Sequence, residues 1–292
     1  QGNEDALEVE KLVALYSKAG CKFFDVSAKP EIIDAAKKGL QGREGYICVS
    51  VGIKGDPHVR KAQIDYEKCA GCHKCEEICP QKTIKHCKVK TARCIGCGKC
   101  YSVCTHGAIS FLSENKDLNE VLPPLIEKGI DCIEFHVMGE DESGIYEKWD
   151  YINSVYDGLL SICTARGKLS EEKMISRIER MTAIRKPYTT IVQADGFPMS
   201  GGKDDYKTTL QAVATAEIVQ NAKMPVYIML SGGTNSKTAE LAKLCGINYN
   251  GIAIGTFARK IVNRYIERED FLKNDYIFNE ALNIARSLVG NV

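Results

Sequence analysis

The sequence lacks the features that mark membrane-spanning or nucleic-acid-binding proteins. No apolar run in its 292 residues approaches the ~18 residues of a membrane-spanning helix. Lysine and arginine (39 residues) nearly balance aspartate and glutamate (38 residues). The resulting net charge of +1 gives no reason to expect a nucleic-acid partner or a polybasic membrane contact. We also see no signal peptide in the sequence.

Cysteine, by contrast, is abundant, and most of it falls in one repeated motif. Eight of the 14 cysteines form two copies of C-x2-C-x2-C-x3-C. The first copy is Cys69, Cys72, Cys75 and Cys79, and the second is Cys94, Cys97, Cys100 and Cys104. Apolar positions repeat with the same offset, because Ile64 corresponds to Val89 and Ile84 to Ile109. The repeat therefore extends beyond the cysteine motifs themselves.

The spacing of each motif suits an iron–sulfur cluster. Three thiolates two residues apart can hold one [4Fe–4S] cluster, while the trailing fourth thiolate points to a second cluster. We therefore predict two clusters with exchanged fourth ligands. Cluster one takes Cys69, Cys72, Cys75 and Cys104, and cluster two takes Cys94, Cys97, Cys100 and Cys79. Two zinc knuckles are the alternative, but zinc sites do not need two triplets with trailing cysteines.

This stretch resembles the bacterial two-cluster ferredoxin domain. Pro80 follows the first motif as in that family, whereas Thr105 replaces the second proline. The six remaining cysteines are scattered, and five of them lie in or beside apolar runs, where we expect buried, reduced thiols. They are Cys21, Cys48, Cys87, Cys132, Cys163 and Cys245. A disulfide scaffold does not fit a chain of this size with iron–sulfur motifs, so we expect a reducing cytoplasm.

The rest of the chain alternates apolar strands with helices. We predict strands at 21–27, 45–52, 131–138, 159–164, 190–195, 225–231 and 251–256. We predict helices at 3–19, 30–38, 116–128, 146–155, 170–184, 206–222 and 236–245, with a long helical tail from 258. Continuous apolar strands of this kind indicate a parallel sheet that is covered on both faces.

Seven βα units in a row favour an α/β fold of the TIM-like (β/α)8 barrel type. We expect the first barrel strand to lie just upstream of this sequence, and a seven-stranded or open sheet is the alternative. The barrel would comprise 1–53 and 114–292, with a two-cluster ferredoxin-like module inserted at 54–113. This insertion follows a barrel strand, at the face where barrel active sites form.

Two glycine-containing loops are candidates for a phosphate site. Gly232 and Gly233 follow one predicted strand, and Gly255 and Thr256 end the next. Loops at these positions often bind phosphate in barrels, because glycine lets backbone N–H groups approach the anion. They resemble loops of flavin-phosphate-binding barrels such as dihydroorotate dehydrogenases, so FMN or another phosphate-bearing ligand is expected. The alternative is that the glycines only permit tight turns.

Polar residues near other strand ends are candidates for catalysis. Asp195, Lys203 and Asp204 lie in or beside a polar, glycine-rich loop and could bind substrate or move protons. The alternative is an ordinary loop in which Asp204 caps the next helix. Glu134 and His136 point to the same side of their strand because side chains alternate. We predict His136 as a pocket residue, against a purely structural role.

Taken together, these segments resemble the LdpA family, the light-dependent-period iron–sulfur proteins of cyanobacteria. The resemblance rests on the two cysteine motifs and on four phrases. These phrases begin at Asp25 (DVSA), Gln193 (QADGFPMSGG), Leu230 (LSGGTN) and Ala253 (AIGTFAR). The family implies a cytoplasmic protein with two iron–sulfur clusters, linked in cyanobacteria to redox sensing for the circadian clock. It supplies no established reaction.

Three functions remain open. The first is an electron relay through two clusters to a redox partner protein. The second is an oxidoreductase in which the clusters serve a flavin or another ligand and a small-molecule substrate. The third is a redox sensor that does not turn over substrate.

Overall fold

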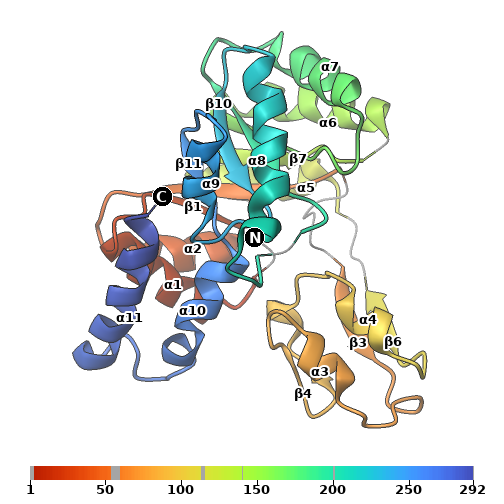
Figure 1. The fold of residues 1–292 in the computed structure, drawn as a ribbon, viewed down its shortest axis with the longest axis vertical. Coiled ribbons are helices and arrows are strands. Elements are labelled where there is room, and N and C mark those ends of the chain that lie inside the picture. The colour runs from red at the N-terminus through yellow and green to blue at the C-terminus, as the bar shows by residue number, and fades with distance from the viewer. Residues whose placement is uncertain (1–2, 54–59, 113–115, 140, 200, 292) are drawn as a thin grey trace.

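The computed structural model describes residues 3–53, 60–112, 116–139, 141–199 and 201–291. Its centre is one seven-stranded parallel sheet (Figure 1). The strands are β1 (Phe23–Ser27), β2 (Tyr46–Val51), β7 (Cys132–His136), β8 (Leu159–Thr164), β9 (Thr190–Asp195), β10 (Tyr227–Ser231) and β11 (Gly251–Ile252). They neighbour one another in chain order, and every neighbouring pair is parallel.

Sequential parallel order is the strand order of a (β/α) barrel, so the predicted fold class is confirmed. All seven predicted strands are present, although β11 is shorter than the predicted 251–256. Among the described residues, β11 does not pair with β1. An additional strand upstream stays a prediction.

Six of the nine helices described outside the cysteine-rich stretch begin at a side-chain cap. The nine helices are α1 (Ala6–Lys18), α2 (Pro30–Leu40), α5 (Leu118–Glu127), α6 (Glu142–Val155), α7 (Glu171–Thr182), α8 (Tyr206–Asn221), α9 (Thr238–Leu244), α10 (Thr256–Ile266) and α11 (Asp275–Val289). Ser170 caps α7 by accepting a hydrogen bond from the Lys173 amide. The cap of α8 is Asp205, not Asp204, whose carboxylate accepts hydrogen bonds from Ser236 instead. The predicted helical tail is two helices, α10 and α11.

The two faces of the sheet differ in polarity. On one face, residues such as Val49, Phe135 and Val192 are fully buried in the main hydrophobic core with the helices. On the other face, the row nearest the N-terminal ends of the strands contains the apolar groups of Cys48 and Cys132 with Ile191. The rows above it, toward the carboxyl ends, are polar.

The cysteine-rich stretch folds beside the sheet, at the lower right of Figure 1. It contains two antiparallel pairs, β3 (Lys61–Ile64) with β6 (Ile109–Leu112) and β4 (Ile84–Lys85) with β5 (Lys88–Val89), and three short helices, α3 (Lys74–Ile78), α4 (Lys99–Val103) and the 3-10 helix η1 (Thr91–Arg93). This stretch has its own small hydrophobic core, built around Ala62, Ile84 and Ile109. The predicted module ends, 54 and 113, lie outside the described residues. None of the described helices is long and apolar enough to span a membrane.

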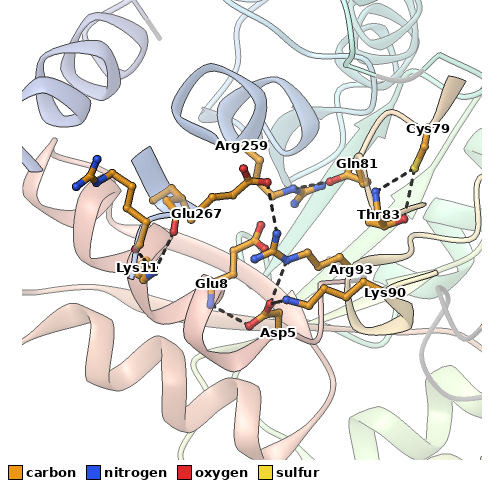
Figure 2. A network of polar contacts seen from close by, with 12 residues as sticks. Asp5, Glu8, Lys11, Cys79, Gln81, Thr83, Lys90, Arg93, Arg259 and Glu267 are labelled. Atoms are coloured by element: carbon orange, nitrogen blue, oxygen red, sulfur yellow. Dashed lines mark hydrogen bonds and ion pairs between the residues drawn. The ribbon is translucent and has the colours of Figure 1, made fainter. Parts of the chain in front are cut away.

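Polar contacts join this stretch to α1 and α10 (Figure 2). Arg93 forms ion pairs with Asp5, at an Nε–Oδ2 distance of 3.0 Å, and with Glu8. Lys90 forms a second ion pair with Asp5. Burial would raise the pKa of Asp5, but the Lys90 hydrogen bond and the Glu8 amide outweigh it and lower the pKa. The acidic start of α1 is therefore the docking point for a basic edge of the cysteine-rich stretch.

A second junction lies directly after Cys79. The Gln81 side chain donates a hydrogen bond to Thr256 Oγ1 (3.2 Å) and accepts one from Arg259 Nε (3.1 Å). Thr256 and Arg259 both belong to the first turn of α10. A residue two positions from a predicted cluster ligand thus contacts the barrel helix that follows β11.

Candidate functional site

The eight motif cysteines line two separate pockets. One pocket, named cluster pocket one, is lined by four of them together with Ile64, Ala108 and Ile109. The other, named cluster pocket two, is lined by the remaining four together with Ala62, Ile84 and Phe111. Pocket one contains Cys69, Cys72, Cys75 and Cys104, and pocket two contains Cys79, Cys94, Cys97 and Cys100. Each pocket therefore takes three cysteines from one repeat and the fourth from the other.

The strands of the two repeats are exchanged in the same way. Ile64 precedes the first motif and pairs with Ile109, which follows the second motif. Ile84 follows the first motif and pairs with Val89, which precedes the second. Each small sheet thus has one strand from each repeat, and this pairing carries Cys79 and Cys104 across to the opposite triplets. The apolar positions that correspond between the two repeats are therefore the positions that pair in the two small sheets.

Backbone amides point at several of the sulfurs, as thiolate ligands require. The Ala62 amide donates to Cys94 Sγ, and the Thr83 amide donates to Cys79 Sγ, both at 3.4 Å. At Cys104, burial would raise the pKa of the thiol, but hydrogen bonds from the backbone at 106–109 lower it. Amide donors of this kind stabilise thiolates and tune the potentials of the clusters that they hold. The residues of both pockets therefore fit iron–sulfur clusters.

Cys87 is a fifth cysteine in pocket one, and no motif in the sequence places it there. Its side chain hydrogen-bonds with Cys69, which raises the pKa of the Cys87 thiol. It lies in the turn between β4 and β5 with a φ of 60°. The first motif is already complete without Cys87, so spacing alone could not place it. Of the other unassigned cysteines, Cys48, Cys132 and Cys163 are buried as expected, whereas Cys245 is exposed.

A second polar cluster fills the inner face of the barrel sheet. His136 Nε2 lies 3.0 Å from Glu134 Oε1, and Cys163 joins them from the neighbouring strand. The Ser50 hydroxyl lies within hydrogen-bonding distance of the Glu134 carboxylate and of Asp25 Oδ1, the latter at 2.7 Å, and donates its one proton between them. Glu134 is fully buried, so the carboxylate depends on these partners rather than on water.

The charges of Glu134 and His136 support one another. Burial would raise the pKa of Glu134, but the His136 charge and hydrogen bonds from His136, Ser50 and Cys163 lower it to about 2. Burial would lower the pKa of His136, but Glu134 outweighs it and raises the pKa to about 9. The two groups form a buried ion pair at neutral pH.

The three predicted catalytic residues lie in two places. Asp195 ends β9 on the inner face, where burial raises its pKa and the His136 charge opposes that shift. Asp195 and His136 therefore share the barrel interior. Lys203 is exposed, and the contact described for it is a hydrogen bond from Asn235 to its backbone carbonyl. The structure does not bring the Lys203 side chain to the other two.

The glycines predicted to bind phosphate do not all have open space beside them. A side chain at Gly232 would meet the Asp195 carboxylate at 2.4 Å, and one at Gly233 would meet the Thr208 carbonyl at 2.4 Å. Both glycines also have positive φ, so they permit close packing at a turn. Gly255 has more space and precedes α10, whose first residue, Thr256, contacts Gln81. A phosphate at α10 stays a prediction.

Comparison with known proteins gives one family match for the barrel part of the chain and one for the cysteine-rich stretch. The sequence pattern of the light dependent period A C-terminal domain matches residues 124–291. The pattern of the LdpA Fe-S cluster-binding domain matches residues 69–115. The chain belongs to the LdpA family. One relative, light dependent period A of Synechococcus elongatus, is 28% identical to this LdpA-family chain over 249 residues, which cover 81% of the chain and 69% of the relative. The protein is thus an iron–sulfur protein.

Similar solved structures include barrel enzymes at very low sequence identity. A monomeric dihydrodipicolinate synthase variant has a TM-score of 0.46 and 10% identity, over 96% of the LdpA-family chain and 72% of that enzyme. The YdjI aldolase of Escherichia coli K12 has a TM-score of 0.48 and 8% identity, over 99% and 87% of the two chains.

Proposed function

We propose that this LdpA-family protein holds two [4Fe–4S] clusters by exchanged ligands and relays single electrons. Cluster one is held by Cys69, Cys72, Cys75 and Cys104, and cluster two by Cys94, Cys97, Cys100 and Cys79. The observation that carries the proposal is the grouping of the eight cysteines into two pockets of four, each drawn from both repeats. A [4Fe–4S] cluster accepts and donates one electron at a time.

The chain supplies insulation to cluster two and access to both clusters. Cys94 and Cys100 are buried against the apolar core of the module, and burial raises the pKa of the Cys100 thiol to about 11. Cys72 and Cys97, the middle cysteines of the two triplets, are exposed. Each pocket thus has one ligand at the protein surface, where a partner protein can approach. We assign these two exposed rims as the entry and exit points for electrons.

The first experiment is anaerobic purification followed by iron, sulfide and flavin quantification on one sample. We expect about eight irons and eight sulfides with no flavin. About four irons in the intact protein would contradict the two-cluster proposal. About one bound flavin alongside the iron would favour the oxidoreductase instead.

The exchange of ligands needs its own test. Cys79→Ala should remove cluster two, because Cys79 lines the pocket of Cys94, Cys97 and Cys100. The paramagnetic resonance spectrum of reduced Cys79→Ala should then match that of Cys97→Ala and differ from that of Cys72→Ala. A match to Cys72→Ala would mean that each motif holds its own cluster.

An oxidoreductase is the second candidate, and the polar barrel interior favours it. Asp195, His136 and Glu134 occupy the carboxyl-terminal half of the inner face, where barrel enzymes place their catalytic groups. In this hypothesis the clusters exchange electrons with a ligand held over these residues. A redox sensor is the third candidate, and the Gln81 junction supports it because it links the Cys79 loop to α10.

A further inference from the structure

The buried cluster of Glu134, His136 and Cys163 has no role in the electron relay. Glu134 and His136 lie on β7, and Cys163 is the residue of β8 that pairs with His136. One nitrogen, one sulfur and one carboxylate oxygen from the three side chains all lie within 4.8 Å of one another. Glu134 and Cys163 are almost completely buried, whereas His136 keeps 17% of its side chain exposed. Three donors of different types thus converge at one end of the barrel interior.

This donor set suits one kind of ion. Imidazole, thiolate and carboxylate together are borderline ligands, which zinc accepts in tetrahedral sites. Calcium and magnesium prefer oxygen ligands alone, so the thiol speaks against them. Sites with three protein ligands keep a fourth position for water or substrate.

The surroundings contain the elements of an outer shell. Ser50 fixes the second oxygen of Glu134, as the partners of metal-binding carboxylates do. Gln193 pairs with Cys163 in register and is fully buried, and its Oε1 has no hydrogen-bond partner among the described residues. The same holds for the buried hydroxyl of Ser161, which pairs in register with Glu134. Buried acceptors without partners are uncommon, and water or substrate on a bound ion would satisfy them.

The alternative role for this cluster is a cysteine nucleophile, and the contacts oppose it. A nucleophilic cysteine needs a base that takes its proton, usually a histidine. Here the Cys163 thiol hydrogen-bonds with the Glu134 carboxylate, whereas His136 Nε2 faces Glu134 Oε1 at 3.0 Å. The histidine is therefore not placed to take the thiol proton.

We infer that Glu134, His136 and Cys163 form a zinc-binding site in the barrel interior, with a fourth position open to water or substrate. This site lies apart from the cluster pockets and does not depend on the electron relay. No cysteine of the two motifs takes part in it.

The test is zinc K-edge X-ray absorption on the cluster-loaded, anaerobically purified protein, after addition of one equivalent of Zn²⁺ and removal of excess ion. Iron does not contribute at this edge. We expect about one zinc per chain, with one sulfur at about 2.3 Å and the other ligands nitrogen or oxygen at about 2.0–2.2 Å. Coordination by sulfur alone would mean that zinc had entered a cluster pocket, and this result would overturn the proposal. A bound zinc content below about a tenth of an equivalent per chain would overturn it as well.

Variants locate the ion. Cys163→Ala and His136→Ala should each lower the zinc content at least tenfold, judged by equilibrium dialysis against a competing chelator. Cys48→Ala is the matched control, because Cys48 is a buried thiol of the same inner face, two rows from Cys163, and it should keep the zinc. Retention of zinc by both Cys163→Ala and His136→Ala would refute the site. If neither variant folds by circular dichroism, the wild-type absorption spectrum decides alone.

Discussion

Replacing Arg93 with Met should destabilise the protein through the contact between the cysteine-rich stretch and α1. Arg93 keeps 20% of its side chain exposed, and its partner Glu8 keeps 7%. Removing one partner of a buried ion pair typically costs about 3–5 kcal/mol, since the other charge stays buried without compensation. We take the lower end, about 3 kcal/mol, because Arg93 retains some contact with water. For a chain of this size, each kcal/mol lowers the melting temperature by about 2 °C, so we expect a decrease of about 6 °C.

The assay is a double-mutant cycle by anaerobic thermal unfolding, followed by circular dichroism. Arg93→Met should be costly alone, whereas the combination with Glu8→Gln should recover about 2 kcal/mol. Lys90→Met is the control, since Lys90 is 53% exposed and a surface ion pair contributes less than about 1 kcal/mol. Additive effects of Arg93→Met and Glu8→Gln, with a coupling below about 0.5 kcal/mol, would refute the buried pair as the docking contact.

Three further predictions concern the cluster pockets and their junction with the barrel. Gly96→Ala should lower the iron content from about eight to about four, because its added carbon would lie 2.2 Å from the Arg60 carbonyl oxygen. Gly71→Ala is the control at the equivalent position of the first motif, where there is open space, and should keep about eight irons. Equal iron contents in the two variants would contradict this prediction. Cys87→Ser should shift the reduction potential of cluster one alone, because its thiol contacts Cys69 and hydrogen bonds to the sulfurs set the potential. An unchanged pair of potentials in a redox titration would mean that Cys87 is a bystander. Gln81→Ala should leave the iron content unchanged but increase the rate of proteolysis of the cysteine-rich stretch, since it removes two hydrogen bonds to α10. Unchanged cleavage rates would mean that this junction does not hold the stretch in place.

Features that follow from a repeated or continuous sequence pattern were predicted correctly. Contacts between side chains on neighbouring strands were missed, because they depend on strand register. The cysteine motifs have fixed spacing, so chemistry alone predicts which four cysteines group together, and the structure groups them in that way. Strand β8 was predicted with its observed bounds, because apolar residues dominate it and Gly158, which is depleted in strands, precedes it. Cys163, however, joins Glu134 and His136 only through the pairing of β7 with β8. No local pattern gives the register between two strands.

The contacts of loop residues could not be predicted from the sequence either. Asp204 and Asp205 are chemically equivalent as helix caps, and only the backbone conformation selects Asp205. Arg93 is one of many basic residues in the sequence, and its importance comes from Glu8, which lies 85 positions earlier. The grouping of the eight cysteines was therefore predictable, because all of them lie within one short repeat.

The two junctions of the cysteine-rich stretch also bear on how the protein matures. The α1 contact uses residues no later than Arg93, whereas the Gln81 contact needs α10, which ends at Ile266. About 150 residues separate the last strand of the cluster pockets from the end of α10. At about 5–20 residues per second of synthesis, the cysteines are complete for about 8–30 seconds before the barrel can close over the Cys79 loop. Cluster delivery during translation would therefore meet pocket two before α10 docks beside it.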